Sequence, residues 1–313
     1  MTRAFIFPGQ GAQAVGMGRA LAEAYPAAAE VFEAVDDALG ERLSAVIWEG
    51  PEDRLTLTAN AQPALMATSL AAVAALATEG VRVADAAFVA GHSLGEYSAL
   101  AAAGALDVGA AARLLRRRGE AMQTAVPVGE GAMAAILGLD LGRVRDLAAL
   151  AAEGEVCEAA NDNDPAQVVV SGHRAAIERA VALAAERGAK RAVMLPVSAP
   201  FHCALMRPAA EAMAEALADA RIETPAVPLV ANVAAHAVSD PETIRRLLVE
   251  QVTAAVRWRE SVAWMAGEGV DETVEAGAGK ALSGMVRRIE RKVATLQVAT
   301  PEDVRKLAEA AAA

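Results

Sequence analysis

The chain is poor in cysteine and in aromatic residues and has no surplus of positive charge, and each shortage excludes a class of protein. Its two cysteines, Cys157 and Cys203, give neither a disulfide framework nor the spacing of a metal site, so we expect no metal ligands. Aromatic residues make up 3% of the 313 residues and hydrophobic residues 55%, which predicts a large aliphatic core. The net charge of −11 argues against nucleic acid as a partner.

An export signal and a membrane segment are also missing from the pattern. Residues Met1 to Pro8 predict a short strand, not the basic and then apolar segments of a signal peptide. Charges, glycine and proline interrupt the apolar runs, so we expect none of membrane-spanning length. We expect a cytoplasmic protein that acts away from membranes.

Length and pattern predict an α/β protein with a small inserted subdomain. Up to residue 128, short apolar runs alternate with longer amphipathic ones, which is typical of a mostly parallel sheet covered by helices. We predict a large α/β domain over 1–128 and 198–313, with later strands at 225–232 and 271–275, and a subdomain over 129–197. About two domains also fit the length.

The predicted subdomain has the ferredoxin-like order β-α-β-β-α-β. Asn161 to Pro165 are rich in Asn and Asp and predict the turn between its two middle strands. The pattern predicts strands over 132–137, 156–160, 167–171 and 191–195, and helices over 141–152 and 174–187.

The most informative motif is Gly-x-Ser-x-Gly at residues 91–95, between a predicted strand at 86–90 and a predicted helix at 94–103. This context is that of a nucleophile elbow, a sharp turn that exposes a serine hydroxyl at a helix N-terminus. Free N–H groups there would stabilise negative charge on a substrate carbonyl oxygen. Ser93 is therefore the candidate nucleophile, and a tight turn with an incidental serine is the alternative.

A serine hydroxyl needs a base to take its proton, and the chain has four histidines. His92 adjoins Ser93 on a sharp turn and should point away from it, His173 opens a predicted helix, and His236 lies in a polar loop. His202 lies in a proline-rich loop between a strand and a helix, where α/β enzymes place catalytic groups. His202 is the candidate base, and a buried structural histidine is the open alternative.

Six motifs follow one another along the chain: residues 7–13, 60–64, 91–96, 118–123, 198–202 and 275–280. Together they closely resemble the malonyl-CoA:acyl carrier protein transacylases of type II fatty acid synthesis and the related acyltransferase domains of polyketide synthases. The resemblance covers essentially the whole chain. Two mild departures are Ala12, where the family often has Ser, and Ala278, where it often has Pro.

The resemblance implies a role for each matched position. Ser93 is expected to carry malonyl as an ester, with His202 as general base and then acid. The backbone carbonyl of Gln251 is expected to orient the imidazole, and the backbone N–H groups of Gln10 and Leu94 to bind the oxyanion. The implied substrates are malonyl-CoA and acyl carrier protein, with no metal or redox cofactor.

The resemblance also implies that Arg118 binds the malonyl carboxylate, for which a guanidinium is a planar bidentate partner. Arg116, Arg117 and Arg118 form a run that would equally suit a solvated helix face. Arg118 shares a helical face with Leu115 and Met122, so it is the member of the run expected to point inward.

Gln62, Met122 and Phe201 are further residues expected at the substrate. In the polyketide relatives, an aromatic residue just before the catalytic histidine accompanies malonyl, and a smaller one accompanies methylmalonyl. The ring of Phe201 would crowd the space of an α-methyl group, or would only pack its loop.

Carrier proteins are acidic, so an acidic enzyme needs basic residues around its entrance. Arg287 and Arg288 follow the Gly277–Lys280 loop and are the candidate docking pair, with ordinary solvated helix residues as the alternative. We expect a monomer.

An α/β serine esterase or thioesterase and a non-catalytic scaffold are the competing interpretations. An esterase needs the order Ser, acid, His with a late histidine, whereas the last histidine here is His236. A scaffold leaves the Gln10 loop, Arg118 and His202 without a purpose. A malonyl transferase of polyketide synthesis fits the motifs as well.

Overall fold

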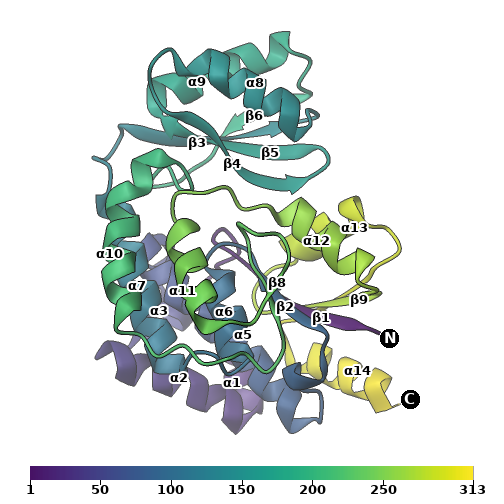
Figure 1. The fold of residues 1–313 in the computed structure, drawn as a ribbon. Coiled ribbons are helices and arrows are strands. Elements are labelled where there is room, and N and C mark those ends of the chain that lie inside the picture. The colour runs from purple at the N-terminus through teal and green to yellow at the C-terminus, as the bar shows by residue number, and fades with distance from the viewer. Residues whose placement is uncertain (313) are drawn as a thin grey trace.

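Two β-sheets organise residues 1–312, which are the residues that the computed structural model describes (Figure 1). The larger sheet has the order β10-β9-β1-β2-β7-β8, and all its pairs are parallel except β7 with β8. Its strands are β1 (Arg3–Phe7), β2 (Phe88–Gly91), β7 (Leu229–Val230), β8 (Ala237–Val238), β9 (Glu272–Ala276) and β10 (Ala294–Val298).

Helices cover both faces of this sheet, so its strands are buried on both sides. Along β1, Phe5 and Phe7 belong to one apolar cluster, and Ala4 and Ile6 belong to another that contains Trp258. The predicted fold class, a mostly parallel α/β domain with an elbow and a small inserted subdomain, is confirmed. The helices are α1 (Arg19–Ala24), α2 (Pro26–Leu39), α3 (Leu43–Glu49), α4 (Glu52–Thr56), α5 (Thr58–Thr78), α6 (Gly95–Ala102), α7 (Val108–Thr124), α10 (Arg207–Ala218), α11 (Pro241–Glu250), α12 (Trp258–Gly267), α13 (Ala281–Ile289) and α14 (Pro301–Ala312), with short 3-10 turns η1 (Val83–Asp85) and η2 (Ala204–Met206).

Helix α5 is the one helix among residues 1–312 that is long and apolar enough to cross a membrane by length and composition. Its 21 residues reach a mean hydropathy of 1.4, and 78% of that stretch is buried inside the protein. The expectation that no apolar run reaches this length was wrong, because Pro63 does not end the helix but lies within it. Since α2 and α7 pack against α5, it is a central helix of the fold.

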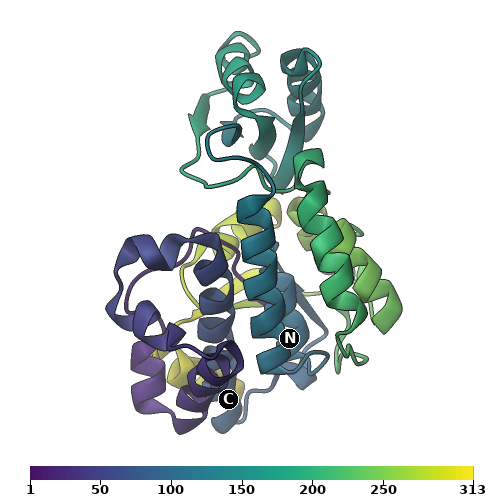
Figure 2. The same ribbon diagram turned by 90° about the vertical axis from the view of Figure 1, so that its left-hand side faces the viewer.

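The smaller sheet forms a subdomain at one end of the large domain, while both chain termini lie on the large domain (Figures 1 and 2). Its order is β4-β5-β3-β6 and all its pairs are antiparallel, as the ferredoxin-like prediction requires. Helices α8 and α9 cover one face and share a separate apolar core with it. The elements are β3 (Gly131–Leu137), α8 (Leu141–Ala152), β4 (Cys157–Asp164), β5 (Gln167–His173), α9 (Arg174–Glu186) and β6 (Arg191–Met194).

The predicted turn at Asn161 to Pro165 is confirmed only at its last residue, because β4 continues to Asp164 and the turn consists of Pro165 and Ala166. Asn and Asp favour turns when their side chains bond to nearby backbone. Asp164 does so, since its Oδ1 accepts from Ala166 N–H at 2.9 Å, but these buried residues also bond across to the large domain. Asp162 N–H donates to Val256 O at 2.9 Å, and Val256 N–H donates to Ala160 O at 2.9 Å.

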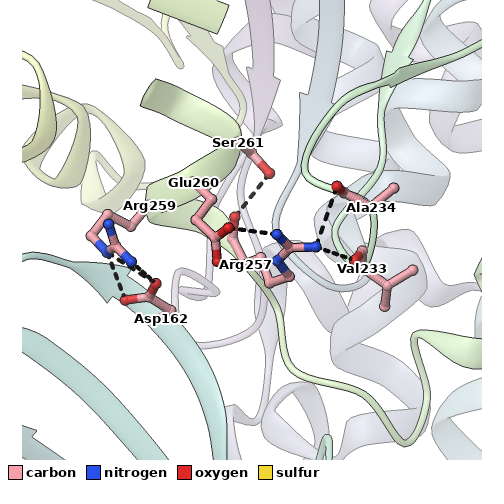
Figure 3. Close-up of polar contacts among 7 residues, drawn as sticks. All are labelled: Asp162, Val233, Ala234, Arg257, Arg259, Glu260 and Ser261. Carbon is pink, nitrogen blue, oxygen red and sulfur yellow. Dashed lines mark hydrogen bonds and ion pairs between the residues drawn. The ribbon is translucent and has the colours of Figure 1, made fainter. Parts of the chain in front are cut away.

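We call the contact between residues 161–164 and the large domain the subdomain junction. Asp162 pairs with Arg259 at 2.8 Å, as Figure 3 shows, and Asp164 pairs with Arg288 at 2.7 Å. Both carboxylates are 1% exposed, and each forms an ion pair with an arginine of the large domain. The junction is thus a set of completed charge pairs that fixes the small sheet against the large domain.

The predicted strand at 225–232 is reduced to the two residues of β7. Pro225 and Pro228 have no N–H to donate to a neighbouring strand, so regular pairing is confined to the short segment after them. The chain then turns away at Asn232, which places that side chain at the carboxyl edge of the sheet.

Candidate active site

The nucleophile elbow forms where β2 ends and α6 begins. Ser93 has a φ of 55°, in the left-handed region that a non-glycine residue seldom adopts. A Cβ at Gly91 would lie 1.9 Å from the backbone of Gly95, and a Cβ at Gly95 would lie 2.3 Å from Phe7 O. Only glycine fits at these two positions, so the motif allows the turn and the close approach of β1 to α6.

The loop after β1 packs against the elbow and brings Gln10 to the cavity. His92 N–H donates to Phe7 O at 3.0 Å, and a Cβ at Gly9 would lie 2.7 Å from His92 O. The backbone N–H groups of Gln10 and Leu94 have no hydrogen-bond acceptor among residues 1–312, and both residues line the cavity around Ser93. They therefore lie where an oxyanion hole requires free donors.

Ser93, His202 and Gln251 form a hydrogen-bonded chain. Ser93 Oγ lies 2.8 Å from His202 Nε2, and His202 Nδ1 lies 2.9 Å from the backbone oxygen of Gln251. A carbonyl oxygen can only accept, so Nδ1 carries the proton and Nε2 is free to accept from the serine hydroxyl. His202 has a φ of 60°, so both ends of the serine–histidine pair have left-handed backbones.

Burial keeps the imidazole of His202 neutral. The side chain is 4% exposed, and desolvation, followed by the nearby charge of Arg118, lowers the pKa of His202 to about 3. A neutral imidazole with its proton on Nδ1 is the form that can take a proton from Ser93.

Arg118 is enclosed in the protein and has only neutral partners. It is 1% exposed and donates to Gln62 Oε1 at 2.9 Å, to Gln251 Oε1 at 2.8 Å and to Ser93 Oγ at 3.1 Å. It forms no ion pair with any residue from 1 to 312, and its Nε has no hydrogen-bond partner there. Because a buried charge without a directly bonded counter-ion is unfavourable, this arrangement suits an anionic group bound beside Ser93.

The position of Arg118 depends on the close packing of α5 and α7. A Cβ at Gly119 would lie 2.6 Å from Thr58 O, so the glycine lets the helices approach and brings Gln62 to the guanidinium. Met122 lies next to Gln62, whose Nε2 is 3.7 Å from the sulfur. Arg117 is exposed, as the helical face predicted.

The cavity around these groups has a volume of about 760 Å³ and lies between the large domain and the small sheet. Phe201 lines it next to His202, and Met133 and Asn161 contribute from the small subdomain. Every residue predicted at the catalytic or acyl-binding site faces this cavity except Gln251, which lies beneath it.

The other predicted positions lie elsewhere. His173 accepts a hydrogen bond from Val156 N–H, and His236 is exposed. Arg287 donates to Thr295 Oγ1 at 2.7 Å, and Arg288 belongs to the subdomain junction. Neither arginine lines the cavity.

Three polar groups beneath Ser93 escaped the sequence analysis. Asn232 Oδ1 accepts from Ser93 N–H at 2.8 Å, and the side chain of Gln251 donates to Ser93 O at 3.0 Å. Glu96, 1% exposed, accepts from both Gln251 Nε2 and Asn232 N–H. The sequence did offer one sign of these groups, namely a carboxylate in the mostly apolar first turns of α6.

Known proteins share this architecture over almost the entire chain. Residues 4–300 match the acyl transferase domain family. The malonyl CoA-acyl carrier protein transacylase of Bacillus subtilis (strain 168) is 46% identical over 302 residues, which cover 96% of this chain and 94% of the relative. The crystal structure of the acyl-carrier-protein-S-malonyltransferase of Bartonella henselae has a TM-score of 0.97 and 53% identity, with 100% of both chains covered.

A third relative was solved with its partner. It is a malonyl-transacylase in complex with a type II polyketide synthase acyl-carrier protein, with a TM-score of 0.96, 40% identity, and 99% of this chain and 100% of that one covered. Sequence and fold agree along the same residues as the cavity and its serine–histidine pair. This chain therefore belongs to the acyl transferase domain family.

Proposed function

We propose that the protein is a malonyl-CoA:acyl carrier protein S-malonyltransferase that works through a malonyl ester on Ser93. The observation that carries this proposal is Arg118, a buried guanidinium with neutral partners, 3.1 Å from the nucleophile oxygen. An acyl group that itself ends in a carboxylate would complete the pairing that Arg118 lacks. The names of the relatives support the same substrate.

Binding begins when the malonyl carboxylate takes the place of Ser93 Oγ as a partner of Arg118. Gln62 and Gln251 hold the guanidinium from the opposite side, so it keeps its orientation as the anion arrives. The anion also offsets the positive charge that lowers the pKa of His202. A carboxylated substrate thus makes the base stronger at the moment when it is needed.

Acylation is an attack of Ser93 Oγ on the thioester carbonyl carbon. His202 Nε2 takes the hydroxyl proton, and the N–H groups of Gln10 and Leu94 stabilise the oxyanion. The carbon–sulfur bond then breaks, and His202 returns the proton to the departing sulfur, which releases CoA as a thiol. In the second half, the phosphopantetheine thiol of the carrier gives its proton to His202 and attacks the ester, and Ser93 regains its hydroxyl.

No cofactor takes part in this scheme. A thioester is exchanged for a thioester, so positioning, proton transfer and oxyanion stabilisation are sufficient. The ring of Phe201 would disfavour an α-methyl branch on the substrate. An esterase would perform the same first half-reaction and then use water as the acceptor in the second, but it needs no buried guanidinium beside the nucleophile.

The malonyl group would supply extender units for fatty acid synthesis. The enzyme would be a monomer in the cytoplasm. Polyketide synthesis is the second candidate, because one relative was solved with a polyketide carrier.

Carrier docking is proposed at the exposed end of α13. Arg287 is the better probe of the predicted pair, since Arg288 holds Asp164 at the subdomain junction. Arg287→Glu should raise KM for carrier protein and leave acylation by malonyl-CoA unchanged, and the effect should shrink with added salt. Arg221→Glu is the matched control, because Arg221 is 90% exposed and lies by the Ala105 loop, away from the cavity. Equal behaviour of the two variants at low salt rejects this docking face.

Intact-mass analysis tests the proposed function most directly. After exposure to malonyl-CoA, the wild-type protein should gain one malonyl group and lose it when carrier protein is added. Ser93→Ala should fold and gain none. Loss of the acyl group to water at the same rate without carrier would identify an esterase instead.

A further inference from the structure

The buried carboxylate of Glu96 lies directly beneath the nucleophile, yet it touches neither a substrate nor a reacting atom. It follows Ser93 by three residues in the first turn of α6 and is 1% exposed. Burial raises the pKa of Glu96 to about 7, although hydrogen bonds from Gln251 and Asn232 and the charge of Arg118 oppose the rise. A carboxylate in such a place is unfavourable unless it has partners, so its partners indicate its role.

Its partners are the two residues whose side chains hold the backbone of Ser93. Asn232 Oδ1 accepts from the Ser93 N–H at 2.8 Å, and Gln251 Nε2 donates to the Ser93 carbonyl oxygen at 3.0 Å. Both come from segments far from the elbow in sequence, and neither is part of a helix or strand. One oxygen of Glu96, Oε2, accepts from Asn232 N–H and from Gln251 Nε2.

Residues 232–234 are themselves held in place by hydrogen bonds from other parts of the large domain. Arg257 donates to Val233 O at 2.9 Å and to Ala234 O at 3.3 Å, and it is held by Glu260, as Figure 3 shows. Asn232 Nδ2 donates to Gly91 O at 2.6 Å, at the end of β2. The segment therefore has a fixed place, and Glu96 closes the connection between it and Gln251.

Gln251 transmits this hold to the other groups of the site. Its backbone oxygen accepts a hydrogen bond from the imidazole of His202, and its side-chain oxygen accepts one from the guanidinium of Arg118. We propose that Glu96 is a positioning residue for acyl transfer, whose carboxylate holds Asn232 and Gln251 and through them keeps Ser93 in its left-handed conformation against His202. This inference rests on the proposed function only in using acylation as its readout.

The test compares variants of the full-length enzyme in single-turnover acylation by malonyl-CoA and by acetyl-CoA. Glu96→Gln keeps the size of the side chain but removes its charge, and Glu96→Ala removes the acceptor. We expect the acylation rate constant to fall by about tenfold in Glu96→Gln and by up to ~10²-fold in Glu96→Ala, because small displacements of a nucleophile have effects of this size. The loss should be the same for both acyl groups, with KM for malonyl-CoA nearly unchanged, since Gln62 still holds Arg118.

Ser98→Ala is the matched control. Ser98 lies on the same helix, is fully buried, and its hydroxyl has no hydrogen-bond partner among residues 1–312. It should acylate at the wild-type rate. A rate constant within threefold of wild type in a folded Glu96→Gln, or an equal loss in Ser98→Ala, overturns the proposal.

A second measurement needs only the wild-type enzyme and one variant. The charged or titratable groups facing Glu96 are Arg118 from α7 and Tyr97 on its own helix, whose pKa is raised so that it stays neutral. Asn232 and Gln251, from the other two segments, do not titrate. The acylation rate constant should decline as pH falls through about 7, since a protonated carboxyl is a weaker acceptor, and the decline should be absent in Glu96→Gln.

The two proposals fail in different ways. If the wild-type protein gains no acyl group from malonyl-CoA, the proposed function is wrong. If it is acylated with no decline near pH 7, and the Glu96 variants behave as wild type, only the role of Glu96 is wrong.

Discussion

The subdomain junction and the active site both bury charged groups, but only the charges at the junction are paired with an opposite charge. At the junction, Asp162 and Asp164 are each paired with an arginine from the other part of the molecule. In the active site, Arg118 is more deeply buried than either of those arginines but bonds only to amide and hydroxyl oxygens. The difference separates charges that are paired within the fold from one that, by our proposal, pairs with the substrate.

This comparison implies that changes in the two regions should have separable effects. Substitutions in the active site should reduce the rate and leave stability intact, and substitutions at the junction should do the reverse.

The largest effect is expected from His202→Ala. Loss of the general base should slow acylation by ~10²–10⁴-fold for malonyl- and acetyl-CoA alike, because the proton transfer is common to both. The backbone strain at position 202 is unchanged in this variant, since alanine keeps the Cβ at a φ of 60°, so unfolding should report only the loss of the buried ring. Stopped-flow acylation and urea unfolding give the two readouts, and a loss below tenfold in rate would exclude His202 as the base.

Arg118→Ala should have a smaller and selective effect. Loss of a charge-assisted pair worth about 3 kcal/mol corresponds to roughly 10²-fold in kcat/KM for malonyl-CoA. Acetyl-CoA should react as fast or faster, because removal of the cation raises the pKa of His202. Arg117→Ala, an exposed neighbour on the same helix, is the control and should change neither substrate. Equal losses for malonyl and acetyl groups would show that Arg118 is structural.

Asp162→Asn should affect stability and leave the rate nearly unchanged. The carboxylate is 1% exposed but its partner Arg259 is 33% exposed, so we expect a loss of about 1–3 kcal/mol, below that of a fully enclosed pair. Urea unfolding measures it. The exposed pair Glu302–Lys306 offers a control, and Glu302→Gln should leave the unfolding midpoint in place. A large loss of acylation rate in Asp162→Asn would mean that the junction also aligns the active site.

The active site should also give stability a dependence on pH. His202 has a folded pKa of about 3 against an ordinary value of 6.5, so between these values the unfolded chain binds a proton that the folded protein does not. Its contribution is fully present above pH 6.5 and is lost as pH falls, by up to about 1.4 kcal/mol per unit. The unfolding free energy of the wild type relative to His202→Gln should therefore decrease from pH 7 to pH 5, and a constant difference would contradict a neutral buried imidazole.

The sequence predicted those features that are determined by residues close together along the chain. Ser93 was found because glycines and a strand–helix change surround it, and the inward position of Arg118 followed from helical periodicity. The polar run at Asn161 to Asp164 was assigned to the turn, which consists of Pro165 and Ala166. Asp162, Asn163 and Asp164 instead end the strand and bond to partners from another part of the chain. Glu96 and Asn232 were missed for the same reason, since their partners are more than one hundred residues away along the chain.

The left-handed backbones of Ser93 and His202 bear on which substitutions these two positions tolerate. Glycine adopts these angles without the strain of roughly 1–3 kcal/mol that other residues bear there. Each active-site side chain therefore bears a backbone strain that a glycine at the same position would not. In a copy of this sequence under no selection for activity, glycine at either position would relieve that strain, so these are two positions where we expect replacement to be tolerated by the backbone.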